Sequence, residues 1–454
     1  MTILNKLKSV FNTFFKLKKQ NNKCILNKNN HLLHFPDEII KQYIQTQMMI
    51  TLNQQQPESF TNQQIIDYLL NLKIIVINWP INNETFKKYC EYFKHLPSLD
   101  TLGVANCMVT DFTPLESLTN IQYLDISQNN LQNIDFLKPL KNLCYLNLSN
   151  NNINSLMPLK YTKNLLNINF SNNNIKNILP ILNNENLKEI NANNNNIKNI
   201  HYICVLKYLE KLSISNINIE NVLFLQYIKS LTFLDLSNNK IKKMFDTQKT
   251  KNLKYININN NYIKDISCIN NMEHLKELVI SKNIICNIDF LKTNQNLEFV
   301  DISYNNIDSL DVFNYLPKIN IILCDGNRIK NLNIKNLEKL SYLSLADNLI
   351  EHINLTDFKN LEFVVLKHNK IKQIPMFFNG QYLKILDISD NNIKDISYVS
   401  NLIGLIKLDI SNNKVENADV LQMLPNLLDL NISNNNISNF SFLNNLKNIK
   451  HLEK

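Results

Sequence analysis

Hydrophobic and polar residues follow a fixed pattern over most of this chain, and the stretch LTFLDLSNNKIKKM, residues 231–244, shows it clearly. Aliphatic side chains occupy Leu231, Leu234, Leu236 and Ile241, with polar residues between them. The alternation around Leu234 and Leu236 predicts a short β-strand whose leucines point to one side and whose neighbours point to the other. One such segment cannot bury its apolar side alone, so it must stack on similar segments.

The same spacing returns at regular steps along the chain. Sixteen units begin at Leu99, Ile121, Leu143, Leu165, Leu187, Leu209, Leu231, Leu253, Leu275, Leu297, Ile319, Leu340, Leu361, Leu383, Leu405 and Leu427, and a partial unit begins at Ile449. Every step is 22 residues except the two that follow Ile319, which are 21. This repeat of L-x-x-L-x-L-x-x-N/C-x-L predicts an α/β leucine-rich repeat solenoid. We expect a curved horseshoe with a parallel concave sheet, short 3-10 or extended convex segments, and a small helical N-terminal region.

An asparagine follows nearly every predicted strand, and we call this column of residues the asparagine ladder. It contains Asn129, Asn151, Asn173, Asn195, Asn239, Asn261, Asn283, Asn305, Asn327, Asn348, Asn369, Asn391, Asn413 and Asn435. An asparagine side chain offers a donor and an acceptor to backbone groups buried between turns. Cys107, a permitted substitute, opens the column and Ile217 interrupts it. Unpaired buried groups cost roughly 1–3 kcal/mol, which predicts a local irregularity at Ile217, with Asn216 or Asn218 placed to compensate.

Residues 1–98 do not follow the repeat and divide into two predicted parts. Residues 1–71 are predicted to form a helical, partly disordered region, in which the capping box starting at Thr61 indicates a helix over about 61–72. Residues 72–98 form a degenerate capping repeat, with a strand in LKIIVINWP followed by a helix. Residues 99–454 hold the sixteen repeats and the partial one, whose uncapped end predicts self-association or cover by a partner.

Two N-terminal segments carry further hypotheses. Residues 1–19 have a basic amphipathic pattern, typical of a helix on a membrane surface or of a helix packed on the solenoid end. The segment LLHFPDEIIKQYI, residues 32–44, resembles the opening of an F-box at Phe35–Ile39. F-boxes joined to leucine-rich repeats act as substrate receptors of ubiquitin ligases. Pro36 at the start of a helix also explains this motif without a partner.

Composition narrows the functional classes. The net charge of +9 comes with 47 lysines and a single arginine, Arg328. Recognition of bases and phosphates relies on arginine, so no nucleic-acid partner is predicted. The four glycines lie too far apart for a phosphate-binding loop. The eight cysteines are scattered and no apolar run reaches 18 residues, which favours an intracellular protein, cytoplasmic or nuclear.

No residue cluster predicts catalysis, a metal or a cofactor. His31 and His34 are the only closely spaced histidines, and no cysteine or carboxylate at ligand spacing completes a metal site. The aspartates that recur on successive strands form a regular row, not a converging acid–base pair. We therefore expect a protein that is not an enzyme and has no cofactor.

The predicted concave face holds the candidate binding residues. Six apolar residues, which we call the apolar patch, should cluster on adjacent strands where other units place Asp, Asn or Ser: Ile321, Leu323, Tyr342, Phe363, Val365 and Ile385. Aromatic and acidic residues that suit protein recognition are Tyr123, Tyr145, Phe233, Tyr255, Phe299, Asp125, Asp235 and Asp301. Rings on neighbouring strands also support one another, which is an alternative reason for the aromatics. A contiguous apolar patch favours a partner site, and the 21-residue spacings beside it predict a local change of curvature.

Two stretches carry a family resemblance: KNLCYLNLSNNNINSLMPL, residues 141–159, and LKILDISDNNIKDISYV, residues 383–399. Their pattern resembles the 22-residue class of leucine-rich repeats, found in the regulatory subunit of protein phosphatase 1 and in bacterial internalins. The resemblance covers about residues 99–448 and is specific for the fold subclass rather than for function. The phosphatase subunit binds its enzyme with acidic and aromatic residues on its concave face. The resemblance implies that comparable positions on this chain are held by Asp125, Asp235, Asp301, Phe233 and Tyr255.

Two departures weaken the transfer of a phosphatase role, since this chain has more units and lacks that family's C-terminal cap sequence. Internalins are secreted or wall-linked, and no signal or anchoring tail supports that here. We therefore predict a non-catalytic scaffold that binds a protein partner on the concave face. The alternatives are a regulatory subunit that binds a phosphatase catalytic subunit, and an F-box-like substrate receptor of a ubiquitin ligase.

Overall fold

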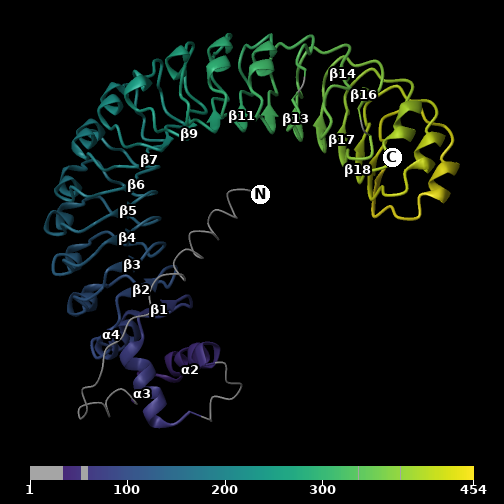
Figure 1. The fold of residues 1–454 in the computed structure, drawn as a ribbon. Helices are drawn as coiled ribbons and strands as arrows, with labels where there is room; N and C mark the ends of the chain where they lie inside the picture. Colours follow the sequence, from purple (N-terminus) through teal and green to yellow (C-terminus); the bar gives the residue numbers. More distant parts are fainter. Residues whose placement is uncertain (1–33, 53–59, 336, 379) are drawn as a thin grey trace. The chain divides into compact units, whose positions relative to one another are not determined.

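The structure is a computed structural model that describes residues 34–52, 60–335, 337–378 and 380–454 (Figure 1). The described residues form two compact units. Unit 1 holds the described residues up to 72 together with 91–98, and unit 2 holds 73–90 and the described residues from 99 onward. The predicted membrane-surface segment, residues 1–19, lies outside the described residues.

Unit 1 is helical and contains α2 (Glu38–Leu52), α3 (Asn62–Asn71) and the end of α4 (Asn83–Phe93). In α2, three fully buried side chains recur every four residues, Ile40, Ile44 and Met48. Residues four apart share one face of a helix, so this face forms the core of the unit.

The start of α3 confirms the predicted capping box. Thr61 is the N-cap, and its Oγ1 accepts a hydrogen bond from the Gln64 N–H at 3.2 Å. The Gln64 side chain returns the contact, since its Oε1 accepts from the Thr61 N–H at 2.8 Å. Two backbone donors at the helix end are thereby satisfied.

Unit 2 is built on one long parallel sheet that lines the inner side of its curve (Figure 1). In the described residues the sheet has eighteen strands, each paired with the next along the chain. They are β1 (Ile74–Ile77), β2 (Thr101–Val104), β3 (Tyr123–Asp125), β4 (Tyr145–Asn147), β5 (Asn167–Asn169), β6 (Glu189–Asn191), β7 (Lys211–Ser213), β8 (Phe233–Asp235), β9 (Tyr255–Asn257), β10 (Glu277–Val279), β11 (Phe299–Asp301), β12 (Ile321–Leu323), β13 (Tyr342–Ser344), β15 (Phe363–Val365), β17 (Ile385–Asp387), β18 (Lys407–Asp409), β19 (Asp429–Asn431) and β20 (His451–Glu453). The predicted solenoid with a parallel concave sheet is confirmed.

The strands at the two ends of this sheet differ in burial. β1 pairs with β2, and its Ile75 and Ile77 are buried. β20 pairs with β19, and all three of its residues are exposed, with Leu452 38% exposed. The predicted self-association through the β20 end stays a prediction, as do the predicted boundaries at residues 71, 98 and 454.

The outer side of unit 2 carries short 3-10 segments, as the repeat length predicts. Their bounds are Thr113–Ser117, Asp135–Leu137, Met157–Tyr161, Leu179–Asn183, Ile200–Val205, Leu223–Tyr227, Thr247–Lys249, Ser267–Ile269, Asp289–Thr293, Asp311–Tyr315, Ser397–Asn401, Asp419–Met423 and Ser441–Asn445. Between residues 316 and 396, the described chain replaces them with a second parallel pair, β14 (Asn354–Leu355) and β16 (Met376–Phe377). This stretch contains the 21-residue steps, so the altered spacing coincides with a different outer layer.

The asparagine ladder ties each unit to the one before it, and Asn151 shows how. Its Nδ2 donates to the Leu148 and Ser149 carbonyls of its own turn and to the Ile126 carbonyl of the preceding unit, at 3.0, 3.3 and 3.1 Å. Its Oδ1 accepts from the Leu131 N–H of the preceding unit at 2.9 Å. The predicted structural role of the ladder is confirmed. A buried polar side chain is tolerated here because its hydrogen bonds are made.

Cys107 opens the ladder as a working substitute for asparagine. Its buried Sγ donates to the Ile77 and Ala105 carbonyls at 3.2 and 3.3 Å. Burial raises the pKa of this thiol to about 11, so it remains a protonated donor at neutral pH.

Ile217 stands where one asparagine of the ladder is missing, yet the backbone carbonyls that this asparagine would bind still accept hydrogen bonds. Each of these carbonyls is within reach of two successive asparagines of the ladder. The Ala192 carbonyl still accepts from Asn195 Nδ2 at 3.2 Å, and the Ile214 carbonyl accepts from Asn239 Nδ2 at 2.8 Å. The neighbouring asparagines therefore supply the missing donors.

The missing acceptor is not replaced. The N–H of Ile197, which would face an asparagine at position 217, donates to no described residue, whereas the equivalent N–H of Ile175 donates to Asn195 Oδ1 at 2.9 Å. Ile197 is 6% exposed and Ile219 half-buried, while Ile175 is fully buried. The predicted local irregularity at Ile217 is confirmed.

The expected compensation by Asn216 or Asn218 is wrong. Asn216 Nδ2 donates to Asn194 Oδ1 at 2.8 Å, outside the buried backbone, and the Asn218 side chain bonds no described residue. Both residues have left-handed backbones, with φ of 54° and 60°, a conformation that asparagine tolerates better than most residues. Their contribution is the shape of the turn, not a hydrogen bond to the gap.

We expect Ile217→Asn to raise the free energy of unfolding by about 1 kcal/mol, because the new amide supplies an acceptor to the Ile197 N–H and outweighs the lost aliphatic burial. An asparagine fits such a turn, since Asn129 also lies between two left-handed residues. Urea unfolding followed by circular dichroism measures the change. The control Ile219→Asn places the same side chain at a position outside the asparagine ladder and should lower the free energy of unfolding. A destabilised Ile217→Asn would contradict the account of the ladder.

Candidate functional site

The concave face of unit 2 presents two side chains from each short strand. In β8, Phe233 and Asp235 are half-buried and Leu234 between them is buried, because successive side chains of a strand point to opposite faces. We call these the first and second outward positions. The first position holds Tyr123, Tyr145, Phe233, Tyr255, Phe299, Ile321, Tyr342, Phe363 and Ile385, and the second holds Asp125, Asp235, Asp301, Leu323 and Val365. Every predicted binding residue is therefore half-buried on this one face.

The structure brings the six residues of the apolar patch together. In the first outward position, Ile321 pairs with Tyr342, Tyr342 with Phe363, and Phe363 with Ile385. In the second, Leu323 and Val365 flank Ser344. Residues that the sequence separates by 21 or 22 positions thus become direct neighbours across four strands.

Phe299 extends this apolar row onto a fifth strand, since it pairs with Ile321. Charged residues end the row on both sides: Glu277 precedes Phe299, and Lys407 follows Ile385. With strands about 4.8 Å apart, the row is roughly 20 Å long. An apolar centre with a charged border is the arrangement found in protein interfaces.

Six of the seven predicted aromatic residues of the face form three separate pairs, and Phe299 belongs to none of them. The rings of Phe233 and Tyr255 are stacked with centroids 4.4 Å apart and planes 4° from parallel. Tyr342 and Phe363 lie within the apolar patch with centroids 5.7 Å apart. The third pair, Tyr123 and Tyr145, is looser at 6.4 Å. Part of each ring is covered by its neighbour, so some of the aromatic content supports the sheet itself.

The three predicted aspartates have structural bonds of their own. One carboxylate oxygen of Asp125, Asp235 and Asp301 accepts from the backbone N–H two residues later, each at 3.0 Å. Asp301 also accepts from Ser281 Oγ at 2.8 Å. These carboxylates hold the turn after the strand, which explains their recurrence without a partner.

Two further acidic residues border the apolar patch, Asp325 and Asp387. Burial raises the pKa of both carboxyls above their ordinary value, although hydrogen bonds from Ser344 and Ser389 act in the opposite direction. Asp387 belongs to the regular aspartate row. Asp325 is not among the residues predicted from the sequence. It occupies a position where most units have serine, and that substitution is the signal in the sequence that could have identified it.

Tyrosines on this face remain protonated at neutral pH. Burial is the main cause that raises the pKa of Tyr145 and of Tyr255 to about 12, and it also raises the pKa of Tyr342. Each hydroxyl therefore offers a donor and an acceptor beside an apolar ring. This combination is common at the centres of protein interfaces.

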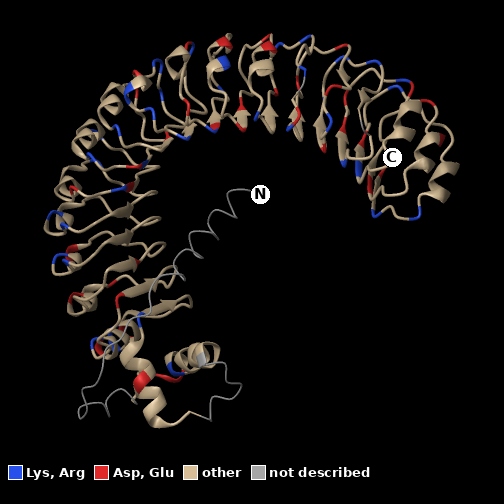
Figure 2. Ribbon diagram, in the orientation of Figure 1, with Lys and Arg blue, Asp and Glu red and all other residues tan. Residues whose placement is uncertain are grey.

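Charges are interspersed along unit 2, with basic and acidic residues on both the strand side and the outer side (Figure 2). Ion pairs link neighbouring units at the edge of the apolar row, Lys276 with Glu298 and Lys384 with Glu362, both at 2.8 Å. Their side chains are about half exposed, so each contributes little to stability. Their charges can still select the partner that reaches the patch.

The described residues hold neither a metal-binding cluster nor a helix that could span a membrane. No group of three or more His, Cys, Asp or Glu among them is placed to hold a metal ion. His34 is described, whereas His31 lies outside the described residues. None of the helices in the described ranges combines the length and apolar character required to cross a membrane.

Sequence comparison matches a known family, described as Leucine Rich repeats (2 copies), to residues 97–139, 229–271 and 251–293. No curated protein matches the chain.

Solved structures share the fold at low sequence identity. The functional domain of InlJ from Listeria monocytogenes is 22% identical, with a TM-score of 0.65 over 76% of this chain and 74% of that one. A leucine-rich repeat protein of Leptospira interrogans is 21% identical, with a TM-score of 0.65 over 82% and 92% of the two chains. A chain of the Drosophila Toll–Spatzle complex is 17% identical, with a TM-score of 0.58 over 80% and 58%. These likenesses establish the fold and leave function to be argued from the site.

Proposed function

We propose that this leucine-rich repeat protein is a non-catalytic scaffold that binds a protein partner through the apolar patch on its concave face. The observation that carries the proposal is the continuous apolar row in the first outward position: Phe299, Ile321, Tyr342, Phe363 and Ile385. Large apolar and aromatic residues dominate the binding energy of protein interfaces when a partner excludes water from them. Proteins of the same fold support the idea, since Toll is solved in complex with Spatzle and the plant peptide hormone receptor RGFR1 with RGF2.

Replacing Leu323 and Val365 together by lysine should reduce recovery of the partner at least tenfold. Both side chains are half-buried and face outward, so a lysine stem can lie on the sheet while its charge remains in water. The charges would then have to be desolvated in the complex, which weakens binding. Affinity purification of the full chain from its source cells, followed by mass spectrometry, identifies the partner. Titration of the purified pair then measures the affinity.

The matched control is Asn167→Lys with Asn191→Lys, on β5 and β6 of the same face. It adds the same charge to half-buried outward positions far from the patch along the sheet. The control should retain the partner. Equal recovery with the patch variant and the control would reject the apolar patch as the contact surface.

A phosphatase regulator is a narrower form of this proposal. Asp125 and Asp235 lie on the concave face with Phe233 and Tyr255, as the resemblance implies, but the aspartates are engaged in their own turns. The same purification tests this role, because a phosphatase catalytic subunit would be the enriched protein.

A ubiquitin-ligase receptor is the second narrower form, and unit 1 offers a structural explanation of its motif. The Phe35 ring packs against Tyr92 with centroids 5.7 Å apart. Asp37 caps α2, since its Oδ1 accepts from the Ile40 N–H at 2.9 Å. The F-box-like residues therefore have local roles, and enrichment of a ligase adaptor is the result that would favour a receptor.

An intracellular location, cytoplasmic or nuclear, belongs to the same proposal. It is supported by seven described cysteines that form no disulfide with one another: Cys90, Cys107, Cys144, Cys204, Cys268, Cys286 and Cys324. Imaging a fluorescent fusion of the full chain tests the location.

A further inference from the structure

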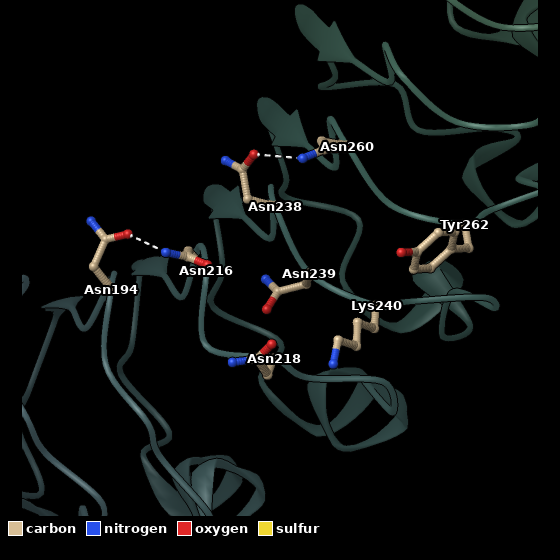
Figure 3. Close-up of a pocket in the computed structure, with 8 residues that line it drawn as sticks. All are labelled: Asn194, Asn216, Asn218, Asn238, Asn239, Lys240, Asn260 and Tyr262. Atoms are coloured by element: carbon tan, nitrogen blue, oxygen red, sulfur yellow. Dashed lines mark hydrogen bonds between the residues drawn. The ribbon is translucent and has the colours of Figure 1, made fainter.

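A shallow cavity of about 340 Å³ lies beside the interrupted ladder, next to the ends of concave strands (Figure 3). Eight residues line it, of which six are asparagines, and all eight lie in the turns that follow β6 to β9. No carboxylate lines the cavity, and its one charged residue is Lys240. The site therefore combines many amides with a single positive charge.

One side of the cavity is a broken chain of amides. Asn216 Nδ2 donates to Asn194 Oδ1 at 2.8 Å, and Asn260 Nδ2 donates to Asn238 Oδ1 at 2.9 Å. The link between these two pairs is missing because Asn238 Nδ2 donates instead to the Ser215 and Ser237 hydroxyls, both at 3.3 Å. Asn216 Oδ1 is thereby left without a donor among the described residues (Figure 3).

The opposite side holds Asn218, Lys240 and Tyr262, which occupy the same position in three successive units. Their side chains make no hydrogen bond or ion pair with any described residue. All three are exposed, with Tyr262 55% exposed. In Figure 3 the Lys240 ammonium lies near Asn218, and the Tyr262 ring stands at the far side of the cavity.

The floor is Asn239, whose amide is fully used. It donates to three backbone carbonyls at 2.8 to 3.1 Å and accepts from the N–H groups of Ile217 and Ile219, both at 3.1 Å. A ligand cannot compete for these bonds without breaking the ladder. Recognition must therefore come from the walls.

The chemistry of these walls selects a small ligand that carries both hydroxyl groups and one negative charge. Amides offer donors and acceptors together, which hydroxyls match and a purely anionic group such as phosphate does not. The ammonium of Lys240 suits one carboxylate, and the Tyr262 ring offers an apolar surface. The volume is at the small end of ligand sites, which span about 300–1,000 Å³.

We propose that this cavity binds an acidic sugar residue, with its carboxylate at Lys240, its hydroxyls at the amides of Asn216 and Asn218, and its ring beside Tyr262. This activity is separate from the proposed protein contact on the concave face. An acidic peptide is less well matched, because its backbone offers one donor and one acceptor per residue, whereas a sugar residue offers several hydroxyls to the amides of the wall.

The test is calorimetric titration of the full chain with trigalacturonate. The neutral galactotriose should bind at least tenfold more weakly. Lys240→Met should weaken trigalacturonate binding at least tenfold and Tyr262→Ala at least fivefold. Lys242→Met, which removes an exposed charge outside the cavity, should leave it unchanged. The unfolding transition of each variant shows that the fold is retained, as expected for exposed positions.

Three results would overturn the proposal. The first is no binding of trigalacturonate to the wild-type chain, and the second is equal binding to wild type and Lys240→Met. The third is binding of tetraglutamate as tight as that of trigalacturonate, which would make the cavity an acidic-peptide site. Loss of the protein partner in the Leu323 and Val365 variant does not bear on these measurements.

Discussion

Asn151→Ala is expected to lower the free energy of unfolding by about 2–5 kcal/mol. The change removes the acceptor of two buried N–H groups, those of Asn129 and Leu131, at 3.1 and 2.9 Å. Each buried donor left unpaired costs about 1–3 kcal/mol. The carbonyls that Asn151 serves lose less, because other donors reach them, as Asn173 reaches the Leu148 carbonyl. Urea unfolding monitored by circular dichroism measures the loss.

The adjacent asparagine is the matched control. Asn152 is exposed and its side chain bonds no described residue, whereas Asn151 is 7% exposed. Asn152→Ala should therefore change stability by less than about 0.5 kcal/mol. Similar losses of stability for the two variants would show that the buried hydrogen bonds of the asparagine ladder make no special contribution to stability.

Leu343→Ala is expected to cost about 2–5 kcal/mol, because Leu343 is fully buried in the middle of β13 and alanine leaves a cavity between stacked units. Each unit of a solenoid is held mainly by its neighbours, so the loss should weaken the contacts with β12 and β15. Thermal unfolding followed by circular dichroism measures the effect.

A substitution of the preceding residue, Tyr342, distinguishes an effect on stability from an effect on partner binding. Tyr342 points outward and is half-buried, so Tyr342→Ala should cost less stability than Leu343→Ala. It should nevertheless weaken partner binding at least tenfold, since it removes the central ring of the apolar patch. A Tyr342→Ala protein that unfolds as easily as Leu343→Ala would assign this ring to the fold. One that retains full partner affinity would remove it from the proposed site.

Most of the fold was predictable because its determinants are local. Alternation of period two identifies which side of each strand is apolar, as in Phe233, Leu234 and Asp235. The 22-residue spacing then places the strands in register, because equal units stack with equal offsets. The capping box at Thr61 likewise depends on residues three apart, and α3 begins where it indicates.

The sequence was enough to predict which residues lie in the candidate site, but not how their side chains pack and hydrogen-bond there. The spacing alone brings Ile321, Tyr342 and Phe363 side by side. It does not show that the last two stack on each other and cover part of their own surface. Nor does it show that the carboxylates of Asp125 and Asp301 are engaged in the turn after their strands. These properties depend on side-chain conformations, which the repeat pattern leaves open.

The error at Ile217 has the same origin. The sequence predicts that Asn216 or Asn218 compensates for the missing asparagine, because these two amides are its nearest neighbours along the chain. In the folded chain the donors come instead from Asn195 and Asn239, one unit away on either side. Carbonyl groups accept two hydrogen bonds, so neighbouring rungs can share them, and only stacking reveals the sharing.

The sequence by itself determined the repeat, the inward and outward positions of each strand, and the asparagine ladder, because these follow from spacings within a unit and between equal units. The tertiary structure alone decided how the polar groups of neighbouring units are paired. It turned the Asn238 amide toward Ser215 and Ser237, left Asn216 with an open acceptor, and thereby shaped the cavity beside Lys240. Hydrogen-bond partners are chosen by distance and angle between side chains of different units, and these exist only once the units are stacked.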